Sequence, residues 1–203
     1  MKLYFIRHGE TEWNVKKKIQ GKTDVPLNEN GRKQARALAE RLLKKQQNGF
    51  LHVKSVYTSP QLRAEETAMA AAKLLEVPCI RLDGLREMDL GEWEGMNWER
   101  IEADYGETYY YWNGHRRYVH TPGGESYNDV LKRTLDALRV ILDKEESDVL
   151  VVTHSAILMA LRCYLAKLPF EEMVARFKTK NTELVEIDAE DILKAMVRFE
   201  AGE

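Results

Sequence analysis

Short apolar runs alternate with longer amphipathic stretches along this chain of 203 residues. The apolar runs at 3–6, 53–57, 79–82 and 149–152 have the length and composition of buried strands. The stretches between them repeat apolar residues every three or four positions, which is typical of helices with one buried face. Strands that alternate with helices indicate a mostly parallel sheet with helices on both faces. The chain is therefore predicted to be an α/β protein, built as a three-layer α/β/α sandwich.

Four amphipathic stretches are long enough to form the helices of the outer layers. They are 28–47, 60–76, 126–144 and 156–167. Ser59 and Pro60 are expected to open the second helix as its N-cap and first helical residue, and Gly49 to end the first helix. Near the C-terminus, the runs 182–187 and 195–199 are predicted to be strands joined by an acidic turn.

The segment 84–125 has no long periodic pattern and is expected to form an irregular lobe with short helices near 97–104 and 107–113. We expect this lobe to lie over the C-terminal edge of the strands, above any active site there, as an insertion in one domain that spans 1–203. Its aromatic residues predict either a small core of their own or the mouth of a pocket, and the two are compatible. They are Trp93, Trp98, Tyr105, Tyr109, Tyr110, Tyr111, Trp112 and Tyr118.

Composition excludes several classes of protein. Lys and Arg number 31 and Asp and Glu number 33, so the formal net charge is −2, which argues against a nucleic-acid partner. No apolar stretch reaches the ~20 residues of a membrane span, and the N-terminal apolar run is too short for a signal peptide. We therefore expect a cytoplasmic protein with no membrane partner. Cys79 and Cys163 have no zinc-site spacing and are expected to be buried, reduced thiols.

Polar side chains follow four of the predicted strands, at the point where each strand ends. Ligands of an open α/β sheet bind beyond the carboxyl ends of its parallel strands. The charged or titratable side chains that follow these strand ends are Arg7, His8, Arg63, Glu87 and His154. Each of them alone has an ordinary explanation, such as a capped loop or a solvated carboxylate. Their convergence at one edge of the sheet instead predicts a single site.

Two arginines in one site indicate an anion with several oxygens, because guanidinium groups bind phosphate through paired hydrogen bonds. Two histidines could also bind a metal, but the nearby carboxylate or thiolate ligands of a zinc set are missing. A neutral imidazole can instead attack phosphorus, while Glu87 gives a proton to the leaving oxygen. Lys16, Lys17 and Lys18 could form a phosphate patch, although a solvated loop is the preferred interpretation.

In this context the chain resembles the histidine phosphatase superfamily, which has the phosphoglycerate-mutase-like fold. The similarity covers nearly the whole chain, and its motifs occur in order. They are Arg7-His8-Gly9-Glu10-Thr11, Trp13-Asn14, Gln20-Gly21, Tyr57-Thr58-Ser59-Pro60, Leu62-Arg63-Ala64, Leu85-Arg86-Glu87, Gly91-Glu92-Trp93-Glu94-Gly95, Pro122-Gly123-Gly124-Glu125-Ser126 and Val151-Val152-Thr153-His154. One departure is Ser155-Ala156, because members of the family often carry Gly directly after the second histidine. The backbone there is expected to be less free to approach a ligand.

The resemblance implies a role for each matching residue. His8 would be the nucleophile that becomes phosphohistidine, and Glu87 would be the acid for the leaving alcohol and then the base for the attacking water. Arg7, Arg63 and His154 would hold the phosphoryl oxygens. The residues expected to bind substrate are Asn14, Gln20, Gly21, Glu10, Thr11 and Ser155. The resemblance implies no metal and no organic cofactor for hydrolysis.

The short interval between Glu87 and His154 resembles the phosphatase branch of the family, such as α-ribazole phosphatases and broad-specificity bacterial phosphatases. The mutase branch has a longer excursion at this place. The predicted function is therefore a metal-independent phosphatase that hydrolyses a small phosphomonoester, with a small phosphorylated metabolite as its partner. Two alternatives stay open: mutase-type phosphoryl transfer, and a catalytically silent phosphate-binding module on the same fold.

Overall fold

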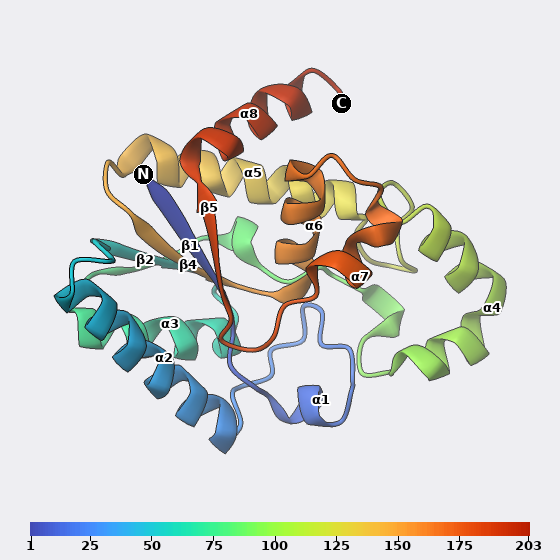
Figure 1. Ribbon diagram of the computed structural model, residues 1–203. Helices are drawn as coiled ribbons and strands as arrows, with labels where there is room; N and C mark the ends of the chain where they lie inside the picture. The colour runs from blue at the N-terminus through green and yellow to red at the C-terminus, as the bar shows by residue number, and fades with distance from the viewer.

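A five-stranded sheet forms the centre of the molecule (Figure 1), and the computed structural model describes all of residues 1–203. The strands lie in the order β3-β2-β4-β1-β5. Their bounds are β1 Lys2–Arg7, β2 Ser55–Thr58, β3 Cys79–Arg81, β4 Val149–Thr153 and β5 Leu184–Asp188. Each neighbouring pair among β1 to β4 is parallel, whereas the edge strand β5 runs antiparallel to β1. The prediction of a mostly parallel sheet is confirmed.

Long helices cover both faces of the sheet (Figure 1). The bounds of these helices are α2 Glu29–Gln47, α3 Leu62–Leu75, α5 Tyr127–Lys144, α6 Ser155–Leu165 and α8 Ala189–Glu200. Leu3 and Phe5 of β1 join the apolar core of α5, α6 and α8, whereas Tyr4 and Ile6 join the core of α2 and α3. Because successive side chains of a strand point to opposite faces, one strand contributes to both cores. The predicted three layers follow from this alternation.

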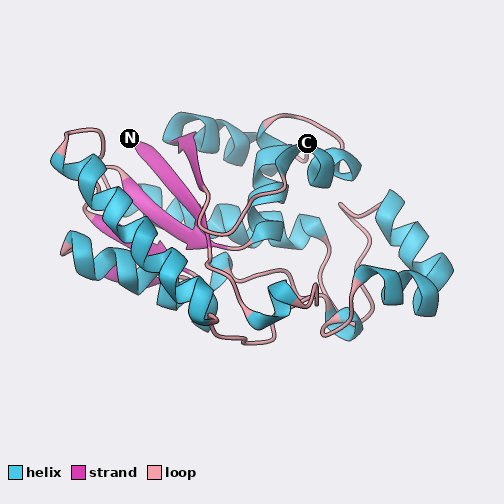
Figure 2. Cartoon of the chain, turned by 60° about the horizontal axis from the view of Figure 1, so that its bottom comes forward, coloured by secondary structure: helices cyan, strands magenta, loops and turns pink.

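The remaining helices lie in the connections between the layers. Their bounds are α1 Glu12–Val15, α4 Trp98–Gly114 and α7 Met173–Phe177, with 3-10 turns at Asp83–Leu85, Gly91–Trp93 and Phe170–Glu172. α4 bends at Gly106, whose φ is 32° and ψ −102°, so the two short helices expected there are two halves of one kinked helix. Figures 1 and 2 show α4 on the side of the molecule away from α2. None of the helices combines the length and the apolar content needed to cross a membrane.

The prediction of a strand at 195–199 is wrong, because those residues belong to α8. The buried side chains of α8 recur at helical spacing, at Ile192, Ala195 and Met196. The acidic residues before them do not form a turn between strands. Glu190 instead lies in the first turn of α8, where a negative charge is favourable beside the positive end of the helix dipole.

The ends of α2 and α3 test the predicted helix boundaries. Gly49 follows α2 with φ 75°, the left-handed conformation expected of it. The predicted start of α3 is too early, because Gln61 is its N-cap and Leu62 its first residue. Ser59 still contributes to this helix start, since its Oγ accepts a hydrogen bond from the backbone N–H of Gln61 at 3.3 Å.

Candidate active site

The parallel pairing of β1 and β4 brings two histidines together beyond the strand ends. Arg7 is the last residue of β1 and lies opposite Thr153, the last residue of β4. The backbone N–H of His8 continues this ladder by donating to the carbonyl oxygen of Thr153 at 3.0 Å. His8 and His154 therefore follow neighbouring strands at the same level, and their ring centroids lie 5.2 Å apart.

The buried ring of His8 is held in one orientation. Its Nδ1 lies 2.7 Å from the carbonyl oxygen of Gly9, which can only accept a hydrogen bond, so Nδ1 carries a proton. The other ring nitrogen, Nε2, keeps its lone pair. Burial, together with the positive charges of Arg63 and Arg7, holds the pKa of His8 well below its usual value. A neutral imidazole with a free lone pair is the form that attacks phosphorus.

Gly9 allows the loop that carries His8 to pass close to α2. A Cβ at Gly9 would lie 2.7 Å from the carbonyl oxygen of Gly31. The backbone N–H of Gly9 donates to Oγ1 of Thr67 on α3 at 3.0 Å. The side-chain amide of Asn181 donates to the carbonyl oxygen of His8 at 2.8 Å. The glycine that follows the Arg-His pair is therefore required by packing.

Two arginines at the strand ends make their hydrogen bonds with carbonyl oxygens. Arg63 is fully buried in the first turn of α3, where it donates to Thr23 and Gly21 at 2.9 and 2.8 Å. Arg7 donates from Nη1 to Thr179 at 2.6 Å. In both arginines Nε has no hydrogen-bond partner. Because a carbonyl oxygen satisfies a donor without neutralising its charge, this part of the site favours a bound anion.

Glu87 follows β3 and presents its carboxyl group to the same place. Oε1 accepts a hydrogen bond from the backbone N–H of Met88 at 3.0 Å, and Oε2 lies 3.5 Å from the backbone nitrogen of Ala156. Gln61 accepts a hydrogen bond from the backbone N–H of Glu87 at 2.7 Å. Burial raises the pKa of Glu87, although the charge of Arg63 acts in the opposite direction. A raised pKa lets the carboxyl hold a proton closer to neutral pH, as a general acid requires.

His154 is completely buried, and neither of its ring nitrogens has a hydrogen-bond partner. Burial and then the charge of Arg63 lower the pKa of His154 well below its usual value, so the ring is neutral. A buried N–H without an acceptor is costly, and an oxygen of a bound ligand would satisfy it. Neither histidine belongs to a group of three His, Cys, Asp or Glu side chains placed to hold a metal ion.

A cavity of about 660 Å³ opens beside these side chains. Most of the residues expected from the sequence line it, namely Arg7, His8, Asn14, Gln20, Gly21, Glu87 and Ser155. Arg63 and His154 are buried behind this lining. Ser155 and Ala156 need no left-handed backbone, so the chain turns into α6 without the glycine that the family often has there.

The sequence matches the family model described as histidine phosphatase superfamily (branch 1) over residues 3–201. The chain belongs to this superfamily. Two relatives come from Arabidopsis thaliana. Phosphoglycerate mutase-like protein 4 is 39% identical over 159 residues, which are 77% of this chain and 67% of the relative. A metal-independent phosphoserine phosphatase is 36% identical over 162 residues, which are 78% of this chain and 66% of the relative. The chain thus spans about two thirds of the length of each plant relative.

A solved structure supports the same assignment. A mycobacterial glucosyl-3-phosphoglycerate phosphatase matches this histidine phosphatase with a TM-score of 0.80 and 29% sequence identity. The match covers 92% of this chain and 90% of that chain. The expected family and fold are confirmed, and the protein is a phosphoric monoester hydrolase of the histidine phosphatase type.

Two residues expected to bind substrate in this histidine phosphatase lie outside the cavity lining. The carboxylate of Glu10 accepts hydrogen bonds from the side-chain amides of Asn28 and Asn30, at 2.9 and 3.1 Å. Thr11 caps α1 and donates from Oγ1 to Oε1 of Gln20 at 3.0 Å. The structure therefore places Thr11 behind the lining, where it holds Gln20, whereas the carboxylate of Glu10 is engaged with the start of α2.

The aromatic residues of the segment 84–125 divide between a core and the cavity. Trp93 and Trp112 are buried and meet edge to face, with ring centroids 5.1 Å apart. Trp98, Tyr109 and Trp112 line the cavity of the phosphatase. Both interpretations of the aromatic pattern therefore hold, and Trp112 belongs to the core and to the cavity wall at once.

Four basic residues line the cavity that the sequence did not assign to the site: Arg116 and Lys178, which it missed, and Lys17 and Lys18, for which a solvated loop is the preferred interpretation. The solvated-loop interpretation of Lys17 and Lys18 is incomplete, since these exposed lysines stand at the cavity. The Arg116 side chain bonds Asn113 and lies over the ring of Trp112, 5.1 Å from its centroid. Arg116 and Lys178 lie in segments without a periodic pattern, so no spacing rule could have placed them beside the histidines.

Proposed function

We propose that this histidine phosphatase hydrolyses a small phosphomonoester through a phosphohistidine on His8, without a metal cofactor. The state of His8 is the observation that carries the proposal. Its ring is buried and neutral, Nδ1 is bound to Gly9, and Nε2 keeps its lone pair beside two guanidinium groups. Arg7 and Arg63 would supply the positive charge that phosphate needs, through paired hydrogen bonds.

In the first step, Nε2 of His8 forms a bond to phosphorus while the bond between phosphorus and the alcohol oxygen breaks. The protonated carboxyl of Glu87 gives its proton to that oxygen, so the product leaves as a neutral alcohol. Nδ1 keeps its proton, and the carbonyl oxygen of Gly9 stabilises the positive charge on the phosphorylated ring. Arg7 and Arg63 hold the phosphoryl oxygens and stabilise the negative charge that is redistributed over these oxygens in the transition state.

In the second step, a water oxygen attacks phosphorus and the bond from Nε2 to phosphorus breaks. Glu87, now a carboxylate, takes a proton from this water. The electron pair returns to Nε2 of His8, and inorganic phosphate leaves. Asn14 and His154 complete the donors around the phosphoryl group in this proposal, since Asn14 lines the cavity and His154 has no other partner.

We propose that the substrate carries a second anionic group in addition to the phosphate. Four basic side chains line the cavity besides Arg7, whereas the carboxylates that line it are Glu87 and Glu99. Arg116 is only 6% exposed and its side chain bonds Asn113 instead of a carboxylate. The named substrates of two similar proteins, phosphoserine and glucosyl-3-phosphoglycerate, both carry a carboxylate beside the phosphate.

We further propose that the segment 84–125 acts as a lobe over the site, within one domain that spans 1–203. In support, α4 from this segment lines the same cavity as His8, which comes from a strand end. The lobe would then contact the part of the substrate that is not phosphate. A cytoplasmic location, expected from the sequence, belongs to this proposal as well.

Trapping the intermediate tests the proposed mechanism. Brief mixing with a phosphomonoester, followed by an alkaline quench, digestion and mass spectrometry, should show one phosphoryl group on the peptide that contains His8. An acid quench should remove it, because N-phosphohistidine is acid-labile, and the variant His8→Ala should never show it. A phosphoserine, or no adduct on a millisecond quench, would overturn the mechanism.

The same reaction in ¹⁸O-labelled water separates the alternatives. A phosphatase transfers the phosphoryl group to water, so the released inorganic phosphate should contain ¹⁸O. A mutase would return the phosphoryl group to an alcohol of the substrate, and the label would stay out of the product. A silent binding module would release no phosphate above the level of His8→Ala.

A further inference from the structure

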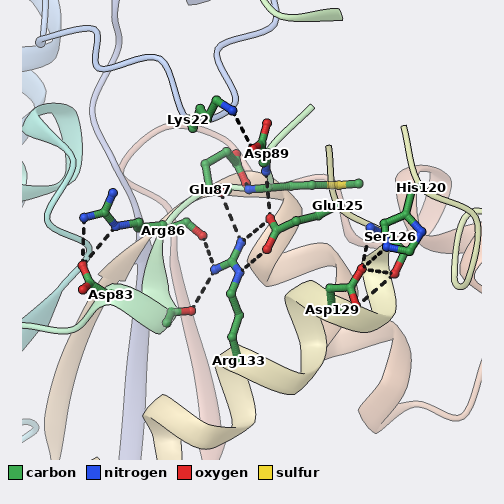
Figure 3. A network of polar contacts seen from close by, with 12 residues as sticks. Lys22, Asp83, Arg86, Glu87, Asp89, His120, Glu125, Ser126, Asp129 and Arg133 are labelled. Carbon is green, nitrogen blue, oxygen red and sulfur yellow. Dashed lines mark hydrogen bonds and ion pairs between the residues drawn. The ribbon is translucent and has the colours of Figure 1, made fainter. Parts of the chain in front are cut away.

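A network of polar contacts lies behind the loop that carries Glu87 (Figure 3). Arg133, in the second turn of α5, donates from Nε and Nη2 to the two carboxylate oxygens of Glu125, at 2.8 and 2.9 Å. Its Nη1 donates to the carbonyl oxygens of Gly84 and Arg86 at 2.9 and 2.7 Å. Its Nη2 also donates to the carbonyl oxygen of Glu87 at 3.2 Å. One guanidinium group thus holds three carbonyls of the loop.

Glu125 holds the other side of the same loop. Its Oε2 accepts a hydrogen bond from the backbone N–H of Asp89 at 2.8 Å. The backbone N–H of Glu125 donates to the carbonyl oxygen of Asp89, also at 2.8 Å. This approach requires glycine at the preceding position, because a Cβ at Gly124 would lie 2.4 Å from the carbonyl oxygen of Asp89. The motif Pro122–Ser126, which has no place in the chemistry above, therefore supports the loop 84–89.

The network fixes the backbone on both sides of Glu87 and leaves its carboxyl group free for the reaction. The side chains of Arg133 and Glu125 are 23% and 25% exposed and neutralise each other. Their contribution is therefore geometric, since every donor of the guanidinium group is used in a fixed fork. A general acid must lie within hydrogen-bond reach of the leaving oxygen, and a misplacement of about 1 Å can cost on the order of 10²-fold in rate.

We propose that Arg133 and Glu125 are positioning residues for Glu87, which hold its loop so that the carboxyl group faces the leaving oxygen. The inference rests on the proposed role of Glu87 as the acid. Neither residue lines the cavity, so both act through the loop. Loss of the network should impair proton transfer to the leaving group and spare the attack by His8.

Leaving groups of different basicity separate these two effects. An alkyl alkoxide needs a proton as it leaves, whereas p-nitrophenolate does not. In single-turnover bursts, Glu87→Gln is the benchmark and should slow phosphoenzyme formation from an alkyl phosphate by about 10²–10⁴-fold. Arg133→Lys should slow the same step by about 10–100-fold, with little change in KM and little effect on p-nitrophenyl phosphate. Glu125→Gln should act in the same direction but more weakly, because its amide oxygen still accepts one hydrogen bond.

Lys132→Gln is the matched control, because Lys132 lies beside Arg133 on α5 but is 65% exposed and pairs with Asp136. It should leave both bursts unchanged. In the double variant Glu87→Gln/Arg133→Lys, the ratio of the burst rates on the two substrates should equal that of Glu87→Gln alone. The acidic carboxyl that Arg133 positions is already absent in both variants. Equal slowing of the two substrates by Arg133→Lys would show a merely structural role and overturn the inference.

The benchmark also separates the two proposals. Equal slowing of the two substrates by Glu87→Gln would overturn the role of Glu87 as the acid, and the inference with it. A selective effect of Glu87→Gln without one of Arg133→Lys would overturn the positioning role alone. The burst with p-nitrophenyl phosphate reports whether each variant is folded. If Arg133→Lys does not fold, Glu125→Gln decides the question by the same two bursts.

Discussion

His8 and His154 are both buried and neutral, but they are held differently. A hydrogen bond to Gly9 fixes the proton of His8 on Nδ1, whereas both ring nitrogens of His154 lack a partner. The sequence predicts that the two residues meet, because each follows a strand of a parallel sheet. It does not predict which ring is oriented, because the orientation depends on a backbone carbonyl whose direction only the folded loop defines. This difference supports the proposed roles of His8 as the nucleophile and His154 as a donor to a bound oxygen.

The buried histidines should make the folded protein sensitive to acid. An unfolded histidine takes up a proton near pH 6.5, whereas the lowered pKa of His154 keeps it neutral in the folded state. The free energy of unfolding should therefore fall as the pH drops below 6.5. One buried histidine accounts for about 1.4 kcal/mol of this loss one pH unit below that value.

Urea unfolding at pH 7.5 and 5.5 measures this effect. His154→Gln should lose about 1.4 kcal/mol less than the wild type between the two pH values. Glu87, whose raised pKa acts in the opposite direction, is present in both proteins and cancels in the comparison. The control His52→Gln, at an exposed position, should follow the wild type. Equal losses in wild type and His154→Gln would mean that His154 is protonated in the folded state.

Secondary structure follows the sequence most closely where the helices are long. The apolar face of α5 and its cap Ser126 are as predicted, with Oγ of Ser126 accepting from the backbone N–H of Asp129. The error at 195–199 arises because five residues contain too little of a helical period to separate it from a strand. Only packing of α8 against α5 and α6 decides between the two. The kink of α4 was accessible from sequence, because Gly106 interrupts the two predicted helices.

Two glycines, Gly91 and Gly123, provide a matched test of how the motif Pro122–Ser126 packs against the loop that carries Gly91. Gly91 and Gly123 both have positive φ, 56° and 70°, so alanine is strained at either position by about 1–2 kcal/mol. A Cβ at Gly91 would also lie 2.0 Å from the carbonyl oxygen of Pro122, whereas nothing lies within 4 Å of one at Gly123. Thermal unfolding should therefore show a clearly larger decrease in Tm for Gly91→Ala than for Gly123→Ala. Equal decreases in Tm would mean that the loop that carries Gly91 and the loop that carries Pro122 can move apart without loss of stability.

The order of the strands explains why one edge of the molecule carries the chemistry. β1 and β4 lie side by side in the sheet, and β2 lies next to β4, so their carboxyl ends deliver His8, His154 and Arg63 to one place. This convergence was predictable, because parallel strands end on the same side. The antiparallel direction of β5 and the basic residues from other segments were not. The direction of β5 and the place of Lys178 depend on how the chain returns after α7, and the places of Lys17, Lys18 and Arg116 depend on the course of two other connections, which no local pattern encodes.

Arginines supply the positive charge of the site, so we expect activity to survive removal of divalent metal ions. kcat/KM should be unchanged after dialysis against EDTA. Arg63→Lys should lose about 10²-fold or more, because a lysine cannot form the paired hydrogen bonds of a guanidinium group. Arg32→Lys, at an exposed arginine that pairs with Glu66, is the control and should be nearly silent. Activity that stops in EDTA and returns with Mg²⁺ would contradict this expectation.

The walls of the cavity come from two different parts of the chain. Strand ends provide His8, whereas the kinked helix α4 provides Trp98, Tyr109 and Trp112. Under the proposed function, mutations that accumulate at Trp98 and Tyr109 over evolutionary time would change which metabolite is recognised, because these residues lie on a different segment from the groups proposed to break the bond. After duplication, a gene for such a protein can therefore diverge toward a new metabolite through changes on α4, a segment separate from the strand ends that carry the reaction centre.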